Sequence, residues 1–289
     1  MSSVEKVNQD TEIRRHVMER YGRIAEEFKL EVGLASCCGP ADNGGSSCCG
    51  PDDTTAMDKV AMMYDTPDVG QLPEEVTGLS LGCGDPVTLA SLQPGQTVLD
   101  LGAGGGIDCF LAAKQVGESG RVIGVDMTAA MLEKARANKA RLGADNVDFR
   151  LGEIEHLPVS DASVDVIISN CVINLSVDKP QVFREAYRVL RPGGKLAVSD
   201  MVTDGPLPAQ VKKSLSAWAG CLAGAWDVDD YVGAIEAAGF VDIEVTPVYL
   251  DKQLLDEAVD QLELADSIPE GDETIYKSCF SAKVTARKA

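Results

Sequence analysis

The stretch "VLDLGAGGGID", residues 98–108, joins a short apolar run directly to a turn that is rich in glycine. Glycines let the chain turn sharply and let backbone N–H groups approach a ligand closely. In an open sheet of parallel strands, such a turn lies at the carboxyl edge, where ligands bind. The sequence therefore predicts a strand–turn–helix unit that presents a ligand-binding edge, with Asp100, Gly102, Gly104 and Gly106 as its candidate residues.

The segments on both sides of this turn predict an α/β fold. From about residue 95, short β-branched runs alternate with helical stretches, a pattern typical of a parallel sheet covered by helices on both faces. Seven strands are predicted, at residues 97–103, 121–127, 147–153, 164–170, 194–201, 242–250 and 277–286. Helices are predicted at residues 10–30, 127–143, 179–194, 208–225, 227–240 and 251–265.

Capping residues set the expected ends of two of these helices. Thr128 is a predicted N-cap and Gly143 a predicted stop for the helix at 127–143, while the glycine pair at 193–194 suits a left-handed cap for the helix at 179–194.

Three segments are expected along the chain. Residues 1–70 contain an amphipathic helix, expected to pack on the core, and then a flexible arm. The arm includes "SCCGPADNGGSSCCGPDD", residues 36–53, which has too few apolar side chains to fold without a ligand. Residues 71–250 form the α/β core, and residues 251–289 add a helix and a strand that complete the sheet.

Composition narrows the classes of function. A chain of 289 residues with 45% apolar content can bury a sizeable core, and its net charge of -20 argues against binding to nucleic acid or to anionic membranes. The N-terminus has no apolar leader and no stretch has the length of a membrane span, so a soluble cytoplasmic protein is expected. Nine cysteines in such a chain predict reduced thiols with metal, redox or nucleophilic roles.

The glycine spacing excludes a dinucleotide fingerprint. Counting from Gly102 and Gly104, the third glycine of that fingerprint would fall at Ile107. Asp126 closes the second predicted strand, where a carboxylate can accept both hydroxyls of a ribose. The turn therefore predicts a nucleoside ligand other than NAD.

Four motifs in order carry a resemblance to a known family. "VLDLGAGGGID", the strand-ending Asp126, "GEIEHLP" (152–158) and "LRPGG" (190–194) resemble the class I S-adenosylmethionine-dependent methyltransferases. The resemblance implies a Rossmann-like, seven-stranded and mostly parallel sheet, with residues 71–250 as the methyltransferase core. It also implies a cofactor site in which Glu153 and Ile154 flank adenine and the glycine turn borders the methionine part. The expected cofactor-binding residues are Asp100, Gly102, Gly104, Gly106, Asp126, Met127, Glu153, Ile154 and Asn170.

Three cysteines lie on segments that are expected to converge at this site. Cys171, in "SNCVINL" (169–175), follows the strand at 164–170, at the edge that faces the transferred methyl group in this fold. Cys83 lies between two glycines before the first strand, and Cys221 follows the fifth strand. A single buried cysteine is usually a small hydrophobic residue, and packing roles are expected for the cysteines at 109 and 279.

Three thiolates suit a soft acceptor. Oxygen and nitrogen acceptors need a base, and neither His16 nor His156 is well placed for that role, although a lysine or carboxylate base stays open. Trivalent arsenic is thiophilic and three-coordinate, and its lone pair needs no base.

The segments "SLGCG", "SNCVINLS" and "WAGCLAGA" resemble the arsenite S-adenosylmethionine methyltransferases over roughly residues 75–245. In that family the cysteines that match Cys83, Cys171 and Cys221 bind arsenic, and Asn170 and Asn174 keep its motif. The resemblance therefore implies methylation of arsenite and then methylarsenite for detoxification, with a thioredoxin-type or glutathione-type thiol reductant as co-substrate.

The chain departs from the family near the N-terminus. Several members carry a further cysteine about thirty residues before the one matching Cys83, where "PDDTTAM" (51–57) offers only threonines. Two "CCGP" motifs could supply that thiol, capture arsenic, bind zinc or have no role; they contain Cys37, Cys38, Cys48 and Cys49.

Two other functions stay open on the sequence. The chain could methylate an organic molecule of the quinone or sterol type, or it could sequester metalloids without catalysis. The number of methyl groups, the physiological reductant and the oligomeric state are not determined, and neither is a saline origin for the acidic surface.

Overall fold

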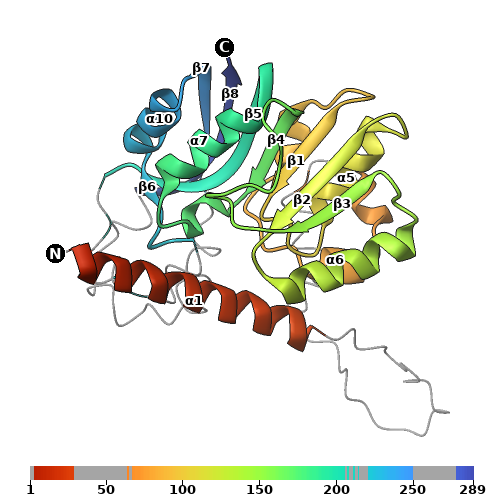
Figure 1. Ribbon diagram of the computed structural model, residues 1–289, viewed down its shortest axis with the longest axis horizontal. Coiled ribbons are helices and arrows are strands. Elements are labelled where there is room, and N and C mark those ends of the chain that lie inside the picture. The colour runs from red at the N-terminus through yellow and green to blue at the C-terminus, as the bar shows by residue number, and fades with distance from the viewer. Residues whose placement is uncertain are drawn as a thin grey trace, which may run out of the picture.

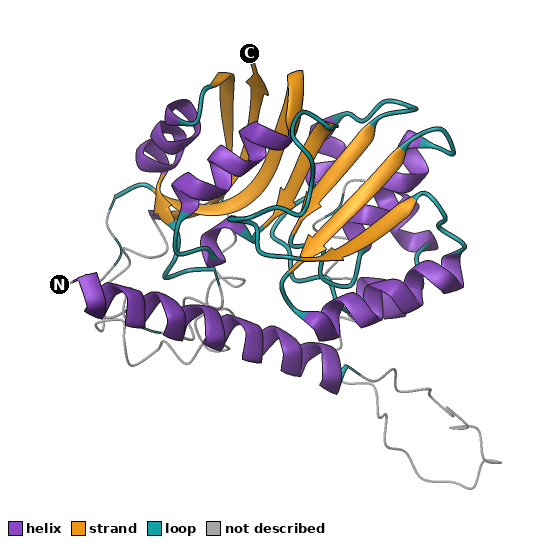
Figure 2. Ribbon diagram, in the orientation of Figure 1, coloured by secondary structure: helices purple, strands orange, loops and turns teal. Residues whose placement is uncertain are grey.

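The computed structural model describes residues 3–28, 64, 67–205, 207, 211, 214, 221–249 and 278–289. These residues form one mixed β-sheet with helices on both faces (Figures 1 and 2). The strands are β1 (Thr97–Leu101), β2 (Arg121–Asp126), β3 (Val147–Leu151), β4 (Val164–Asn170), β5 (Leu190–Thr203), β6 (Trp226–Asp227), β7 (Phe240–Val248) and β8 (Cys279–Lys288). The helices are α1 (Ser3–Glu27), α3 (Glu74–Thr77), α4 (Pro86–Ala90), α5 (Ile107–Val116), α6 (Ala129–Leu142), α7 (Lys179–Val189) and α10 (Val228–Ala237), with short 3-10 turns η1 (Pro67–Gln71) and η2 (Ile173–Leu175).

The strand order is β3-β2-β1-β4-β5-β8-β7, and β6 pairs with β5 off this path. The first five strands are mutually parallel, whereas β8 lies antiparallel between β5 and β7. The seven predicted strands are thus confirmed, and the two-residue β6 is an eighth that the sequence did not indicate. The fold is that of a class I methyltransferase.

Side-chain alternation along the central strand builds a core on each face of the sheet. Val98 packs with one apolar cluster, which includes residues of α5 and α6, while Leu99 and Leu101 pack with the other, which includes residues of α7 and α10. Successive residues of a strand point to opposite faces, so a run of apolar residues is buried on both sides. This burial fixes the carboxyl edge of the sheet, where the strands end.

The predicted strand–turn–helix unit is confirmed at the glycine turn. Gly106 is the N-cap of α5 and has a φ of 96°, which favours glycine. A Cβ at this position would also lie 2.7 Å from the Phe110 ring. The turn is therefore compact because both its backbone angle and its packing require glycine there.

One predicted helix end needs correction. The helix at 179–194 ends at Val189, because Leu190 is already extended and pairs with Val164 as the start of β5. Gly193 has a left-handed φ but lies inside β5, so the glycine pair is not a helix cap. Thr128 does occupy the N-cap of α6, but its side chain makes no capping hydrogen bond there, and Gly143 ends α6 as predicted.

The predicted helix at 208–225 does not reach Cys221. Residues 221–224 form turns, and Cys221 has a φ of 64°, a left-handed angle that an α-helix does not contain. Most of that predicted helix, the helix at 251–265 and the cysteine-rich segment at 36–53 lie outside the described residues.

The N-terminal helix packs on the core as predicted. It crosses the end of the sheet at which the parallel strands terminate (Figure 1). Ile13 and Val17 are buried there in a cluster with Cys171, Leu175 and Met201. In the part of the chain that the structure describes, no helix combines the length and apolar character needed to cross a membrane.

Candidate active site

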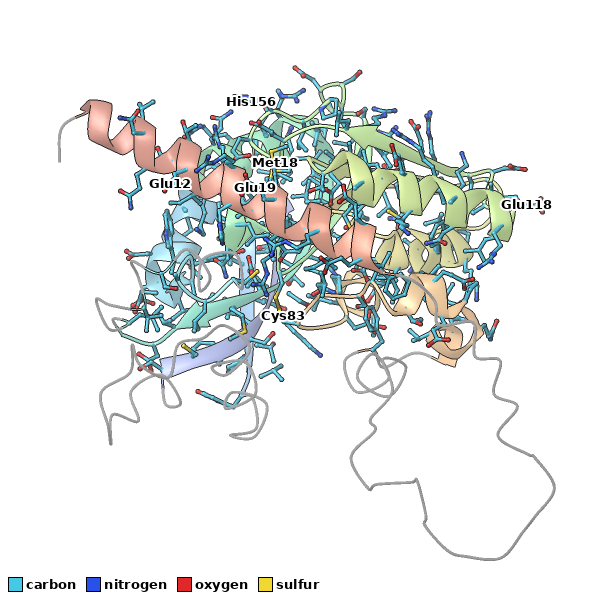
Figure 3. The ribbon with its side chains drawn as sticks, turned by 90° about the horizontal axis from the view of Figure 1, so that it is seen from below. Glu12, Met18, Glu19, Cys83, Glu118 and His156 are labelled. Carbon is cyan, nitrogen blue, oxygen red and sulfur yellow. A yellow bond between two sulfur atoms is a disulfide. The ribbon has the colours of Figure 1, made fainter. Side chains whose placement is uncertain are left out.

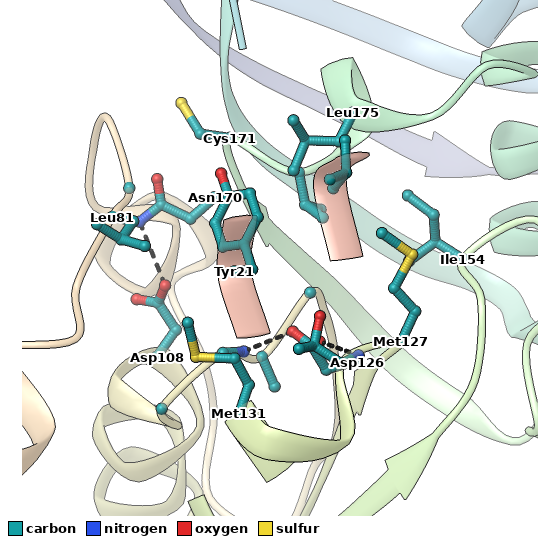
Figure 4. Close-up of a pocket in the computed structure, with 18 of the residues that line it drawn as sticks. Tyr21, Leu81, Asp108, Asp126, Met127, Met131, Ile154, Asn170, Cys171 and Leu175 are labelled. Carbon is teal, nitrogen blue, oxygen red and sulfur yellow. Dashed lines mark hydrogen bonds between the residues drawn. The ribbon is translucent and has the colours of Figure 1, made fainter. Parts of the chain in front are cut away.

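A pocket of about 990 Å³, counted with its open mouth, lies at the carboxyl edge of the sheet beneath α1 (Figure 4). Its walls come from α1, the glycine turn after β1, the end of β2, the loop at 152–155 and the end of β4. Most of the predicted site residues line it: Gly102, Gly104, Asp126, Met127, Glu153, Ile154, Asn170 and Cys171. The other four predicted site residues are not among the lining residues: Cys83, Asp100, Gly106 and Cys221.

The two glycines at the centre of the turn have different roles. A Cβ on Gly102 would lie 2.4 Å from Val172, so that glycine is required for packing. A Cβ on Gly104 would meet no described atom within 4 Å and would project into the pocket. Gly104 therefore leaves open the space that a ligand close to the backbone would occupy.

Asp126 ties the glycine turn to the end of β2. One carboxylate oxygen accepts the Gly104 N–H at 2.9 Å, and the other accepts the Thr128 N–H at 2.7 Å (Figure 4). Burial raises the pKa of Asp126, and these backbone hydrogen bonds oppose the rise. Each carboxylate oxygen can accept a second hydrogen bond, so the group still suits two ribose hydroxyls.

The pocket contains a buried carboxylate that the sequence reasoning did not single out. Asp108, in the first turn of α5, has Asn170 Nδ2 3.2 Å from Oδ2, whereas its Oδ1 has no partner among the described residues. Burial raises the pKa of Asp108 to about 7, and hydrogen bonds from Asn170 and Tyr64 counteract this effect. A half-satisfied carboxylate in a pocket suits a cationic group such as an ammonium. The sequence feature that could have identified Asp108 is its position two residues after Gly106, the last glycine of the turn.

Asp100 faces the interior behind this carboxylate. It is buried and accepts the Cys109 thiol at 3.2 Å. Its own burial, followed by the nearby Asp108, raises the pKa of Asp100 well above its ordinary value. Asp100 therefore lies behind the pocket and not in its lining.

The three predicted arsenic-binding cysteines, here called the cysteine wall, come together at the end of β4, and Cys171 is the one of them that lines the pocket. Cys83 and Cys171, which are 88 residues apart, form a disulfide with a Cα–Cα distance of 5.9 Å. The Cys221 thiol donates a hydrogen bond to the Cys171 carbonyl at 2.7 Å. Cys83 is partly buried, whereas His156 is exposed and lies at the edge of the view from below (Figure 3).

The chemical state of these sulfurs differs from the prediction of three thiolates. Two are oxidised to a disulfide, because the folded chain brings them within bonding distance. Burial, and then the negative charge of Asp200, raises the pKa of Cys221 far above its ordinary value, so that group is a neutral thiol. The disulfide must be reduced before the three sulfurs can act together as ligands.

Backbone conformation marks two of the cysteines. Cys171 and Cys221 have φ angles of 55° and 64°, in the left-handed region that residues other than glycine adopt rarely. The Cys171 N–H still donates to the Ser199 carbonyl, so the strand pairing of β4 with β5 holds this residue in place. Strained residues of this kind cluster at functional sites.

A buried polar network lies next to Cys221, and the sequence analysis had noted only Asn174 from it. The Asn174 amide donates to Asp200 at 2.9 Å and to the Met201 carbonyl, and the Tyr231 hydroxyl donates to Asp200 at 3.1 Å. Burial raises the pKa of Asp200 to about 7, although the charge of Lys179 opposes the rise. Burial likewise lowers the pKa of Lys179 to about 8. These residues come from η2, α7, β5 and α10, so only the tertiary fold assembles them.

The cysteines at 109 and 279 are both buried, in line with their predicted packing roles. Cys279 shares an apolar cluster with Cys171 and Cys221. Two residues along β8, the Ser281 hydroxyl donates to the Cys83 carbonyl at 3.1 Å. Strand β8 therefore supports the cysteine wall. Cys37, Cys38, Cys48 and Cys49 lie outside the described residues.

Comparison with known proteins supports a specific family. The family profile described as "Methyltransferase domain" matches residues 92–239. An arsenite methyltransferase of Halobacterium salinarum is 48% identical over 238 residues, which cover 82% of this chain and 59% of that protein. An arsenite methyltransferase of Aquipseudomonas alcaligenes is 42% identical over 201 residues, which cover 66% of this chain and 58% of that protein. This chain thus spans somewhat less than two thirds of the length of these curated relatives.

A solved structure extends the comparison to three dimensions. The crystal structure of CrArsM, an arsenic(III) S-adenosylmethionine methyltransferase from Chlamydomonas reinhardtii, matches with a TM-score of 0.61 and 36% identity. The match covers 81% of this chain and 74% of that one. Together with the domain match over residues 92–239, this similarity shows that the chain belongs to the methyltransferase-domain family and, within it, to the arsenite methyltransferases.

Proposed function

We propose that this protein transfers methyl groups from S-adenosylmethionine to trivalent arsenic, first in arsenite and then in methylarsenite. Cys83, Cys171 and Cys221 are the proposed arsenic ligands. The observation that carries the proposal is that Cys171 lines the pocket beside the glycine turn, and that Cys83 and Cys221, both distant in sequence, are joined to Cys171 by a disulfide and a hydrogen bond. Membership of the arsenite methyltransferases supports the same activity.

The residues of the pocket fit the proposed cofactor. Gly104 leaves the space beside the turn open, Asp126 offers acceptors for ribose hydroxyls, and the half-satisfied Asp108 suits an ammonium group. Glu153 and Ile154 line the wall next to Asp126 that we assign to adenine. S-adenosylmethionine, when bound, would supply an electrophilic methyl group: the lone pair of trivalent arsenic would form the As–C bond while the S–CH3 bond breaks, S-adenosylhomocysteine would leave, and the arsenic would be formally oxidised by two electrons.

Arsenic capture follows from the thiol chemistry of the cysteine wall. Three protein S–H groups and arsenite, which has three hydroxyls, give three As–S bonds and three molecules of water. No separate base is needed overall, because each thiol proton leaves with a hydroxyl. This balance suits Cys221, which is a neutral thiol in the structure. The exposed position of His156 agrees with a reaction that uses no histidine base.

The disulfide supports a requirement for an external thiol reductant. Two reductant thiols would convert the Cys83–Cys171 disulfide to two protein thiols and would themselves become a disulfide. The same reductant class would supply the two electrons that return methylated arsenic to the trivalent state. We assign this role to a thioredoxin-type or glutathione-type co-substrate.

The test is to incubate the purified full chain with arsenite, S-adenosylmethionine and a thiol reductant, and to separate the arsenic species by chromatography with mass detection. Methylated arsenic should appear with reductant present and cease to accumulate without it. Protein that binds arsenite without methylating it would indicate a sequestering protein. Methylation of an organic quinone or sterol, but not of arsenic, would indicate the other alternative, and either result would reject the proposal.

A further inference from the structure

The N-terminal helix α1 places a tyrosine, Tyr21, against one of the three cysteines. Tyr21 on α1 lines the pocket, and its hydroxyl is hydrogen-bonded to the Cys221 sulfur. Figure 4 shows the ring standing in the pocket, with its hydroxyl directed toward the end at which Cys171 lies. Tyr21 also packs against the apolar cluster that contains both of these cysteines.

We propose that Tyr21 is a positioning residue of the arsenic site, and that its hydroxyl holds the Cys221 sulfur next to Cys171 and stabilises it when it binds arsenic. This inference rests on the proposed function and adds to it a residue from α1.

The hydrogen bonds around Cys221 give the physical basis of this role. In the structure the sulfur has two partners, because its S–H donates to the Cys171 carbonyl and it accepts from Tyr21. When arsenic displaces the thiol proton, the bond to the carbonyl is lost. The bond from Tyr21 remains, and hydrogen bonds to a sulfur that carries negative charge are stronger than those to a neutral thiol.

Tyr21 remains a donor throughout the working pH range. Burial, followed by the nearby Cys221 sulfur, raises the pKa of the Tyr21 phenol well above 10. The charged groups that act on Cys221 come from three other positions. Arg20 of α1 and Lys179 of α7 lower the pKa of Cys221, and Asp200 of β5 raises it. Tyr21 thus acts on Cys221 through a hydrogen bond from an uncharged group, whereas the three other residues act on Cys221 through their charges.

The docking of α1 does not depend on this hydroxyl. Ile13 and Val17 supply buried apolar contacts on the same helix, and Arg14 forms an ion pair with Glu155 at 3.6 Å. Tyr21→Phe should therefore keep the helix in place while it removes only the donor. Tyr187→Phe is a matched control, because the Tyr187 ring packs against Phe240 and Tyr187 is not among the pocket-lining residues.

The experiment compares reduced wild-type protein with Tyr21→Phe and Tyr187→Phe. Calorimetry should give S-adenosylmethionine affinities within about twofold of each other. Arsenite affinity and the rate of arsenic methylation should fall at least about tenfold in Tyr21→Phe alone, as expected for the loss of a hydrogen bond to a charged group. The pH profile of Cys221 alkylation, followed by peptide mass spectrometry, should move to higher pH in Tyr21→Phe.

A double-mutant cycle tests whether the loss of arsenite affinity in Tyr21→Phe arises through Cys221 or from a general structural change. In a Cys221→Ser background, Tyr21→Phe should cause little further loss of arsenite affinity, whereas additive losses would show that the two residues act independently. Unchanged arsenite affinity and an unchanged alkylation profile in Tyr21→Phe would overturn the inference. Wild-type protein that binds arsenite without methylating it would instead reject the proposed function and leave the comparison of arsenite affinities valid.

Discussion

The side chain of Asn170 holds the backbone of Cys83. Its amide oxygen accepts the Cys83 N–H at 2.9 Å, and its amide nitrogen donates to the Gly84 carbonyl at 2.8 Å. Asn170 immediately precedes Cys171, so one side chain aligns the segments that carry two of the proposed arsenic ligands. Gly82 approaches the same amide so closely that a Cβ there would lie 2.3 Å from Nδ2.

Asn170→Ala should therefore release the Cys83 segment from the end of β4. The two hydrogen bonds to the Cys83 segment are lost, each worth about 1 kcal/mol, so arsenite affinity should fall by roughly tenfold or more. S-adenosylmethionine affinity should also fall, because Asn170 lines the same pocket and its amide nitrogen lies 3.2 Å from the Asp108 carboxylate. Calorimetry with each ligand measures both effects. Asn146→Ala, which removes amide bonds to the carbonyls of Ala113 and Gly117 away from the pocket, is the matched control. Equal losses in both variants would contradict this role.

Asp126→Ala should weaken S-adenosylmethionine binding by about 1.5 to 3 kcal/mol, through loss of charged hydrogen-bond acceptors for the ribose. The structure adds a second cause, because the same carboxylate holds the Gly104 and Thr128 N–H groups. Arsenite affinity should be retained. Asp148→Asn, which alters only a surface ion pair of β3 with Arg121 and Arg150, provides the control. Cofactor affinity that is unchanged in Asp126→Ala would remove the ribose assignment.

The pKa of Asp108, raised by burial to about 7, predicts pH-dependent cofactor binding. Below pH 7 the group is neutral, and above pH 7 it is a carboxylate that can pair with the ammonium of S-adenosylmethionine. Affinity should therefore rise about tenfold between pH 6 and pH 8. Calorimetry across this range should show the rise in the wild type and a flat, weaker profile in Asp108→Asn. A wild-type profile as flat as that of the variant would exclude Asp108 as the partner of the ammonium.

The sign is opposite for folding of the ligand-free protein. A carboxyl whose folded pKa is raised above its ordinary value of 3.8 binds its proton more tightly in the native state. Its contribution to the free energy of unfolding is complete at low pH and is lost as the pH rises from about 4 through 7. Chemical denaturation at several pH values should show a smaller decline over this window in Asp108→Asn than in the wild type.

Serine variants of the three cysteines should differ in activity, because arsenite and methylarsenite offer different numbers of binding sites to thiols. Arsenite offers three sites to thiols, whereas methylarsenite offers two, so one cysteine becomes dispensable. Cys171 lines the pocket, and the Cys221 thiol donates a hydrogen bond to the Cys171 carbonyl. Cys83 lies between two glycines on another segment. Cys83→Ser should lose methylation of arsenite and keep appreciable activity on methylarsenite. Cys171→Ser and Cys221→Ser should lose both.

Arsenic speciation on both substrates, in reduced protein, measures this difference. Cys279→Ala, which removes a buried thiol from the same apolar cluster, is the control and should retain both activities. A Cys171→Ser enzyme that methylates methylarsenite at nearly the wild-type rate would contradict the assignment of Cys171 as a retained ligand.

The sequence by itself determined the sheet and the glycine turn, and most of the site residues that it predicted line the pocket. Strand burial on both faces and the glycine spacing are local properties, so residues 98–108 and Asp126 could be placed correctly. Local signals failed where pairing with a distant segment decides the conformation. The helix α7 ends at Val189 because Leu190 pairs with Val164. Cys221 lies in a turn and not in a helix, and its thiol donates a hydrogen bond to the Cys171 carbonyl.

Only the tertiary structure decided the chemical state of the site. Whether a cysteine is a thiolate, a thiol or half of a disulfide depends on distance and burial, and neither is encoded by spacing along the chain. The disulfide spans 88 residues, and burial keeps Cys221 protonated. The contributions of Tyr21 and Asp108 have the same origin, because each depends on partners that the fold brings from other elements.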